Sequence, residues 1–137
     1  PGVPRLEMHE IFPHVPLHIG DLTIVPIQVM HGKLPILGFR IGTFAYITDM
    51  KTIADTELPY LEGVETLVVN ALRFEKEHHS HQLVDDAVRF AHSIGAKRTY
   101  ITHVCHHIGL YTDAQQRMPE GVTLAYDGQV ITVDADR

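Results

Sequence analysis

Residues 67–102, LVVNALRFEKEHHSHQLVDDAVRFAHSIGAKRTYIT, decide the fold, because they combine an apolar strand, an amphipathic helix and a second strand. Residues 66–72 are a short apolar run, typical of a buried strand. Residues 80–93 follow helical spacing, with Ser80 as the expected N-cap and Gly95 as the expected residue after the C-cap. The strand at residues 98–102 follows at once. This order predicts a crossover between neighbouring strands of one sheet.

The rest of the chain extends this unit into a strand-rich α/β (α+β) pattern. Further strands are expected at residues 22–29, 37–41, 44–48, 124–126 and 130–133. The pairs 37–41 with 44–48 and 124–126 with 130–133 are each joined by a short Gly-containing turn, which predicts two hairpins. Pro26 favours an edge position or a bulge for the first of these strands. A short helix at residues 58–61 completes a mixed sheet with flanking helices.

Composition indicates a globular protein of one domain, residues 1–137. The chain is 45% hydrophobic and 20% charged, without tryptophan. A net charge of -6 disfavours a role in coating nucleic acid. A run long enough to span a membrane is absent from the sequence, and its first residues do not resemble a signal peptide, so we expect a cytoplasmic location without membrane contact. The single cysteine, Cys105, excludes an intramolecular disulfide, and its default interpretation is a small buried residue.

Histidine is the unusual component, with 11 residues in the chain. His31, Asp49 and His103 end apolar strands or follow them directly. Strand ends are rigid, and one carboxylate with two imidazoles suits zinc, manganese or iron. The alternative is that these side chains cap the turns in which they lie.

Several segments resemble motifs of the metallo-β-lactamase superfamily. AYITD (residues 45–49) and TYITH (residues 99–103) are similar to its fourth and fifth motifs, and VMHG (residues 29–32) is similar to its third. HHSH (residues 78–81) resembles the histidine motif of the tRNase Z and cyclic phosphodiesterase branches. The segments NALR, THVCH and LAYDG, at residues 70–73, 102–106 and 124–128, resemble the branch related to the phosphonate-pathway phosphodiesterase.

The resemblance implies the C-terminal half of an αββα sandwich that binds two divalent cations (zinc, manganese or iron). In this family the residue at Asp49 bridges the two metals, His31 holds the first, and His103 holds the second. His81 would donate a proton near the leaving group. His78 and His106 would support the ligands or contact the substrate.

The family's four-ligand motif, His-x-His-x-Asp-His, belongs to the N-terminal half and is absent from this sequence. We therefore expect the chain to act with that missing half, which is cleaved off, a separate chain or a preceding segment. A homo-oligomer is left open. Because coordination shells must be filled to hold metal tightly, the ligands present here are a partial set.

The expected activity of the complete protein is metal-dependent hydrolysis of a small or cyclic phosphodiester. Alternatives on the same fold are thioester or lactone hydrolysis and tRNA 3′-end processing. An inactive structural fragment or partner is an alternative from a different class. A histidine-rich metal buffer is disfavoured, because these histidines follow apolar strands and do not form a flexible tract.

Overall fold

The structure is a computed structural model that describes residues 2–133. Within these residues, seven strands form one sheet. The strands are β1 (Leu17–Ile19), β2 (Leu22–His31), β3 (Leu34–Ile41), β4 (Phe44–Ile47), β5 (Thr66–Asn70), β6 (Arg98–Thr102) and β7 (Val122–Leu124). The α-helices are α1 (Val84–Ser93) and α2 (Tyr111–Gln116), and the 3-10 helices are η1 (Asp55–Leu61) and η2 (His106–Ile108).

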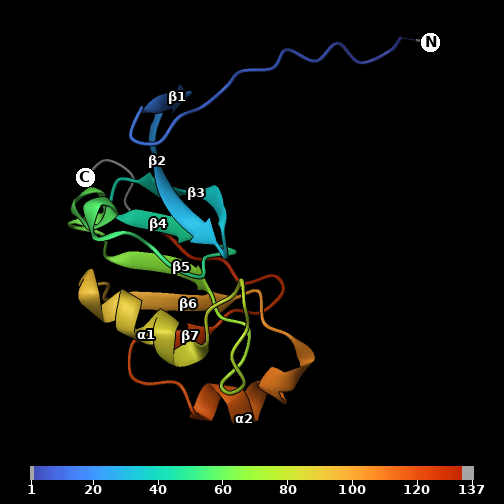
Figure 1. Cartoon of the computed structure of the whole chain (residues 1–137), viewed down its shortest axis with the longest axis vertical. Helices are drawn as coiled ribbons and strands as arrows, with labels where there is room; N and C mark the ends of the chain where they lie inside the picture. Colours follow the sequence, from blue (N-terminus) through green and yellow to red (C-terminus); the bar gives the residue numbers. More distant parts are fainter. Residues whose placement is uncertain (1, 134–137) are drawn as a thin grey trace.

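The strands lie in the sheet in the same order as in the chain, from β1 to β7 (Figure 1). Strands β1 to β4 pair antiparallel, whereas β4 to β7 pair parallel. Two antiparallel steps separate β2 from β4, so β2 points in the same direction as the parallel strands. The C-terminal ends of β2, β4, β5 and β6 therefore lie along one edge of the sheet.

One face of the sheet carries the core. Ile47, Val69 and Ile101 are neighbours in the register of β4, β5 and β6, and all three are fully buried. Gly38 on β3 lies beside this row. A Cβ atom at Gly38 would stand 2.8 Å from Cγ1 of Ile47, so the close packing of side chain on backbone requires glycine there.

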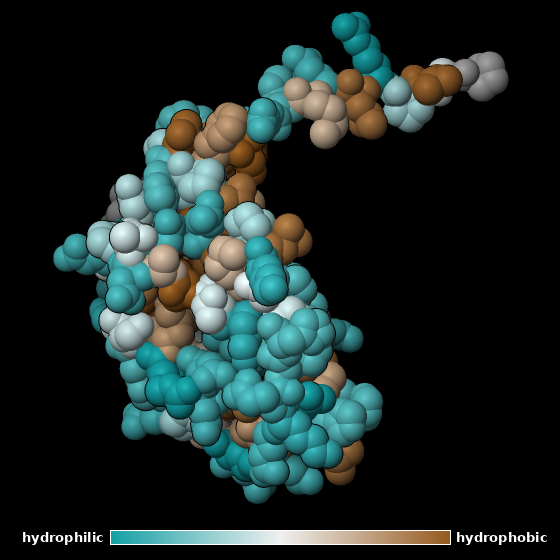
Figure 2. All heavy atoms as spheres, in the orientation of Figure 1, coloured by the Kyte–Doolittle hydropathy of each residue, from teal (hydrophilic) through white to brown (hydrophobic). Residues whose placement is uncertain are grey.

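Helix α1 covers this face and contacts β5 and β6. It buries Ala87, Phe90 and Ala91, which recur at helical spacing on its inner side. Figure 1 shows α1 in front of β6 and β7, with α2 below them. The surface over the two helices is largely hydrophilic in Figure 2. The helices therefore shield one side of the sheet.

The opposite face is less covered. Tyr46, Val68 and Tyr100 are register neighbours on this face. Tyr46 is 47% exposed, and the other two side chains are half-buried. A hollow of about 140 Å³ on this side is lined by Val68, Tyr100, Tyr126 and Ile131, among others. An apolar sheet face that is this open is typical of a surface that packs against another layer.

Pro26 lies at a local edge of the sheet, as the sequence predicts. Strand β1 pairs with β2 only as far as Ile24, so the outer side of β2 is uncovered at Pro26. There the backbone carbonyl of Pro26 accepts a hydrogen bond from the His14 amide at 2.9 Å. The buried carboxylate of Glu57 accepts the Gln28 amide at 3.0 Å and contacts His14 Nε2 at 2.7 Å.

The helix at residues 80–93 begins later than predicted, at Val84. Leu83 is the N-cap, and its amide donates to Oδ2 of Asp86 at 3.0 Å. Ser80 is instead buried in the preceding loop, where its hydroxyl contacts the rings of His78 and His81. The predicted C-terminal boundary is confirmed, because Gly95 has a φ of 71°.

The predicted hairpin of residues 124–126 with 130–133 is wrong. Strand β7 pairs parallel with β6 because Val122 and Leu124 extend the buried face, and residues 130–133 form no strand. The turn itself is present, with a φ of 82° at Gly128. The helix predicted at residues 58–61 is the 3-10 helix η1, which begins earlier, at Asp55. Sequence patterns missed β1, η2 and α2, which are short and mostly polar or exposed.

Residues 2–12 extend away from the sheet and are exposed (Figures 1 and 2). Leu6 and Met8 in this segment are 82% and 87% exposed. Across residues 2–133, none of the helices has the length and apolar character needed to cross a bilayer.

Candidate metal centre

The candidate centre lies at the sheet edge where the ends of β2, β4, β5 and β6 meet. His31 is the last residue of β2, and Asp49 follows β4 by two positions. His103 follows β6 directly, and His81 comes from the loop between β5 and α1. The parallel direction of these strands brings residues that are up to 72 positions apart in the sequence to one place.

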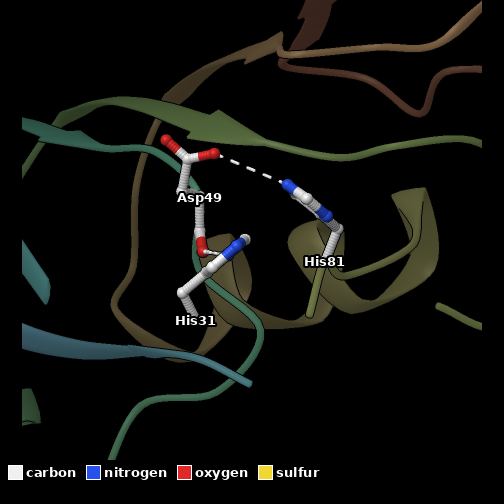
Figure 3. Close-up of side chains that lie close together, drawn as sticks. All are labelled: His31, Asp49 and His81. Atoms are coloured by element: carbon white, nitrogen blue, oxygen red, sulfur yellow. Dashed lines mark hydrogen bonds and ion pairs between the residues drawn. The ribbon is translucent and has the colours of Figure 1, made fainter. Parts of the chain in front are cut away.

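Asp49 is the residue that the histidines share. Its Oδ1 atom lies 3.3 Å from His103 Nε2 and 3.5 Å from His81 Nε2. The rings of His81 and His103 stack at 4.9 Å, and the ring of His31 meets that of His81 edge-on at 4.7 Å. One ligand atom each from His31, Asp49 and His81 lies within 4.8 Å of the other two (Figure 3).

The backbone at both Asp49 and His103 is left-handed, with φ of 60° and 59°. Such conformations are uncommon outside glycine and persist when the surrounding structure enforces them. At Asp49 the enforcement comes from Asn70, which is fully buried. The Asn70 side chain accepts a hydrogen bond from the Met50 amide at 2.8 Å and donates one to the Met50 carbonyl at 2.9 Å.

This role of Asn70 is not predicted by the sequence, where Asn70 stands out only as part of the NALR segment. One feature of the sequence could have indicated this role: Asn70 is an amide side chain at the end of an apolar run. A buried amide needs specific hydrogen-bond partners. Gln82, also buried, extends the same network by donating to the Asn70 carbonyl at 2.8 Å. Together the two amides tie the strand end at Asp49 to the loop that carries His81.

His31 has its tautomer fixed by the backbone. Its Nδ1 lies 2.8 Å from the carbonyl oxygen of Asp49, a contact that is drawn in Figure 3. A carbonyl oxygen only accepts hydrogen bonds, so Nδ1 must carry the proton. The Nε2 atom is then left with a lone pair, which is the form of imidazole that binds metals.

His81 is half-buried, with the Asp49 carboxylate beside Nε2 and the side chains of Ser80 and His78 beside Nδ1. Burial lowers its pKa, and repulsion from His103 and His31 lowers the pKa further, while the contact with Asp49 raises it. The sequence places His81 in the first turn of a helix, but it lies three positions before α1. Burial and neighbouring imidazoles, and not a helix dipole, therefore depress its pKa.

The structure brings His78 to this cluster but not His106. The Nδ1 atom of His78 lies 3.1 Å from Nδ1 of His81, and its pKa is lowered first by partial burial and then by the charge of His79. His106 instead places its ring 3.9 Å from that of His107, on the exposed helix η2. Cys105 is half-buried, with its sulfur 3.8 Å from Nδ1 of His107.

The donor set fits a divalent metal. Three imidazoles and one carboxylate are ligands that zinc, manganese and iron all accept. The fixed tautomer of His31 leaves a lone pair on Nε2. Oδ1 of Asp49 lies near the Nε2 atoms of both His81 and His103, so the carboxylate and the two imidazoles could bind the same metal site. Both features are expected of a metal site.

Comparison with known families identifies the superfamily of the chain. Residues 1–104 match the beta-lactamase superfamily domain, which covers most of the chain. The chain belongs to the beta-lactamase superfamily. Its mixed seven-stranded sheet with a few helices also has the expected fold class, since solved metallo-beta-lactamase-fold proteins superimpose on it.

Two solved structures show the extent of the likeness. A diphosphatase from the PhnP family is 33% identical, with a TM-score of 0.87 over 94% of this chain and 50% of that protein. The metallo-beta-lactamase fold protein YhfI from Bacillus subtilis is 21% identical, with a TM-score of 0.66 over 87% of this chain and 53% of its own. The second of these shares the fold alone. The present chain spans about half the length of each of these two proteins.

A curated relative is also similar over almost the whole chain. It is an octanoyltransferase of Porphyromonas gingivalis (strain ATCC BAA-308 / W83), 39% identical over 134 residues. The match covers 98% of this chain but 27% of that protein. The chain thus spans about a quarter of this relative's length.

Proposed function

We propose that the chain forms part of a metal-dependent hydrolase of small phosphodiesters. The observation that carries this proposal is the convergence of His81 and His103 on Oδ1 of Asp49. The likeness to a solved diphosphatase at 33% identity supports phosphorus chemistry. A cyclic or ribose-linked phosphodiester is the substrate that we infer.

In this proposal His31 would hold one cation, His103 would hold a second, and Asp49 would offer its carboxylate to both. Zinc, manganese and iron all suit these ligands. When bound, two such cations neutralise charge on phosphate oxygens and lower the pKa of a water molecule. The chain's own contribution is to orient the ligands through the left-handed backbone at Asp49 and His103 and through the buried side chain of Asn70.

His81 is the residue that we assign to proton transfer. Its Nε2 atom faces the carboxylate, where it would donate a proton to the departing oxygen. Its Nδ1 atom faces Nδ1 of His78, which accepts a hydrogen bond from the Ser80 amide at 3.3 Å and therefore has a lone pair on this side. The Ser80 hydroxyl also contacts Nδ1 of His81, at 3.2 Å. We infer that His78 and Ser80 orient the ring of His81 so that Nε2 faces Asp49.

We further propose that the remaining ligands come from a segment that covers the open face of the sheet. Three observations support this: the chain spans about half of the solved structures it matches, it supplies a partial ligand set, and Tyr46 stands 47% exposed on that face. The natural occupant is the other half of the sandwich, which carries the His-x-His-x-Asp-His motif.

Hydrolysis of a thioester or lactone is the second candidate, and the name of the octanoyltransferase relative favours testing acyl chemistry. Phosphodiester and thioester hydrolysis differ in their need for His81. A phosphodiester has an alkoxide leaving group that gains from a proton, whereas a thiolate leaves readily without one. His81→Ala would therefore slow phosphodiester hydrolysis much more than thioester hydrolysis.

The test is hydrolysis of a cyclic phosphodiester by the full native chain, before and after removal of metal. We expect activity that chelation abolishes and added zinc or manganese restores. His81→Ala should lower kcat by about 100-fold, the lower end of typical proton-transfer contributions. His92→Ala, an exposed histidine on α1, is the matched control and should keep the full rate. Activity that survives chelation, or faster turnover of octanoyl thioesters than of phosphodiesters, would refute the proposal.

A further inference from the structure

The last strand of the sheet, β7, pairs with another strand on one side only. It lies parallel to β6, and residues 2–133 place no further strand beside it. An edge strand leaves backbone amides and carbonyls that can pair with a strand of another molecule. Two common protections, a charged side chain and a proline within the strand, are missing from Val122-Thr123-Leu124. Protection of this edge must therefore come from outside β7.

The backbone groups of Val122 and Leu124 point away from β6. The inner side of the strand is marked by the Ala125 amide, which donates to the Ile101 carbonyl of β6 at 2.8 Å. In a strand the backbone groups of successive residues point to opposite sides. Those of Val122 and Leu124 therefore lie on the outer side of the sheet.

The side chain of Gln115 occupies this outer side. Its Oε1 accepts the Leu124 amide at 2.7 Å, and its Nε2 donates to the Val122 carbonyl at 3.3 Å. In a parallel ladder, one residue of the next strand makes the same two bonds with its own backbone. Gln115 thus takes the place of one residue of a further strand. The Val122 amide is occupied as well, because it donates to the Pro119 carbonyl at 3.1 Å.

Helix α2 holds Gln115 in this position. Figure 1 shows α2 below β7, and the two elements are in contact. Ala114, the residue before Gln115, is 1% exposed, so the helix is anchored in the core next to the glutamine. The chain then returns to β7 through Gly121, which has a φ of 79°. A Cβ atom at Gly121 would stand 3.0 Å from the Lys97 carbonyl, so this return is closely packed.

The outer side of β2, beyond the end of β1, shows a similar arrangement. There the Glu57 carboxylate accepts the Gln28 amide at 3.0 Å, and the His14 amide donates to the Pro26 carbonyl at 2.9 Å. Groups from outside the strands thus occupy the positions of a further strand at two distant places. This recurrence indicates that the sheet is shielded against strand addition.

We propose that Gln115 keeps β7 from pairing with β7 of a second copy of the chain. A two-fold axis would bring the same outward groups of both copies together, with Val122 of one copy opposite Leu124 of the other in an antiparallel pair. A β-branched and apolar strand suits such pairing. The proposal depends neither on the metal centre nor on the reaction.

The test is the molar mass of the native protein that contains this chain, measured by light scattering after gel filtration over a range of concentrations. Gln115→Met removes both hydrogen bonds and keeps the length of the side chain. As concentration rises, this variant should reach twice the mass of the unmodified protein. Gln116→Met changes the exposed neighbour on α2 and is the control, which should keep the unmodified mass. An unmodified mass for Gln115→Met at every concentration, or association beyond the doubled mass, would overturn the proposal.

Hydrogen exchange shows whether the new contact lies at β7. At low concentration, the Leu124 amide of Gln115→Met should exchange about tenfold faster than in the unmodified protein, because it loses its acceptor. At high concentration it should be protected again. The Ala125 amide, bonded to Ile101, should stay protected throughout. Loss of protection at Ala125 would show that Gln115 only tethers β7 to the sheet, and fast exchange of Leu124 in the associated form would place the contact elsewhere. Both results would contradict the proposal.

Discussion

The position of Asp49 is set by Asn70, which holds the backbone of the next residue, Met50. Asn70 is fully buried and exchanges two hydrogen bonds with the backbone of Met50, and these bonds hold the left-handed turn at Asp49. An Asn side chain suits this task because it offers a donor and an acceptor at once. The position of the Asp49 carboxylate in the candidate metal centre therefore depends on Asn70, which is not itself one of the candidate ligands.

Asn70→Ala should lower the free energy of unfolding by about 2–4 kcal/mol, because it leaves the amide and carbonyl of Met50 buried without partners. Urea denaturation measures the loss. Gln116→Ala, an exposed amide on α2, is the control and should change stability by less than about 0.5 kcal/mol. A loss below 1 kcal/mol in Asn70→Ala would show that the clamp is unimportant.

The paired imidazoles of η2 give a prediction about protonation. The charge of His106 is the main cause of the lowered pKa of His107. His106→Gln should therefore raise the pKa of His107 toward the ordinary value of 6.5, as read from ring-proton chemical shifts. His92→Gln serves as the control and should leave it where it is. An unchanged His107 pKa in His106→Gln would contradict this assignment of cause.

The sign of the stability effect follows from the same shift. The folded state of the metal-free chain binds the His107 proton more weakly than the unfolded state does. Stability is therefore complete above pH 6.5 and falls as the pH drops from 6.5 through the lowered pKa. His106→Gln should reduce this loss.

Among the site residues, the meeting of His31, Asp49 and His103 was predictable from the sequence. Each follows an apolar strand, and strands of one direction end at one edge. The clamp by Asn70 and the contact of His78 with His81 were not predictable as contacts, because both depend on how the loop between β5 and α1 folds back.

At the scale of elements, α1 shows how a local signal is overridden. Ser80 is a favourable N-cap residue, yet the helix begins at Val84, whose amide donates to the Arg73 carbonyl at 3.0 Å. Tertiary contacts keep residues 78–83 in the loop that carries His81. The strands β2 to β6 were predictable because they are runs of β-branched and apolar residues bounded by turn signals. In contrast, β1 and α2 have only three and six residues with little burial.

Because α1 begins at Val84, both Asp85 and Asp86 lie in its first turn, and we can predict which of the two stabilises the helix more. Asp86 accepts the Leu83 amide at 3.0 Å and also pairs with Arg89, whereas Asp85 is exposed in the same first turn. Asp86→Ala should lower the free energy of unfolding by about 1 kcal/mol, and Asp85→Ala by less than about 0.5 kcal/mol. Both variants lose the same favourable dipole interaction, but only Asp86→Ala also loses the cap, together with the exposed pair with Arg89, which contributes little. Equal losses in denaturant titrations would argue against capping by Asp86.

At the scale of the whole molecule, the two faces of the sheet differ in kind. Helix α1 buries one face, while Tyr46, Val68 and Tyr100 leave the other partly open. The chain also spans about half of the solved structures to which it is similar. Both observations support the proposal that metal binding belongs to a larger unit, in which the ligands of this chain are one part of the coordination shell.

Metal content per chain tests the central proposal most directly. Elemental analysis of the native protein that contains this chain together with the segment proposed to supply the remaining ligands, purified without chelator or affinity tag, should find about two zinc, manganese or iron ions per molecule. Asp49→Ala should lose most of this metal, whereas Asp113→Ala, which removes an exposed carboxylate on α2, should keep it. Metal near zero in the unmodified protein, or full occupancy in Asp49→Ala, would contradict the account.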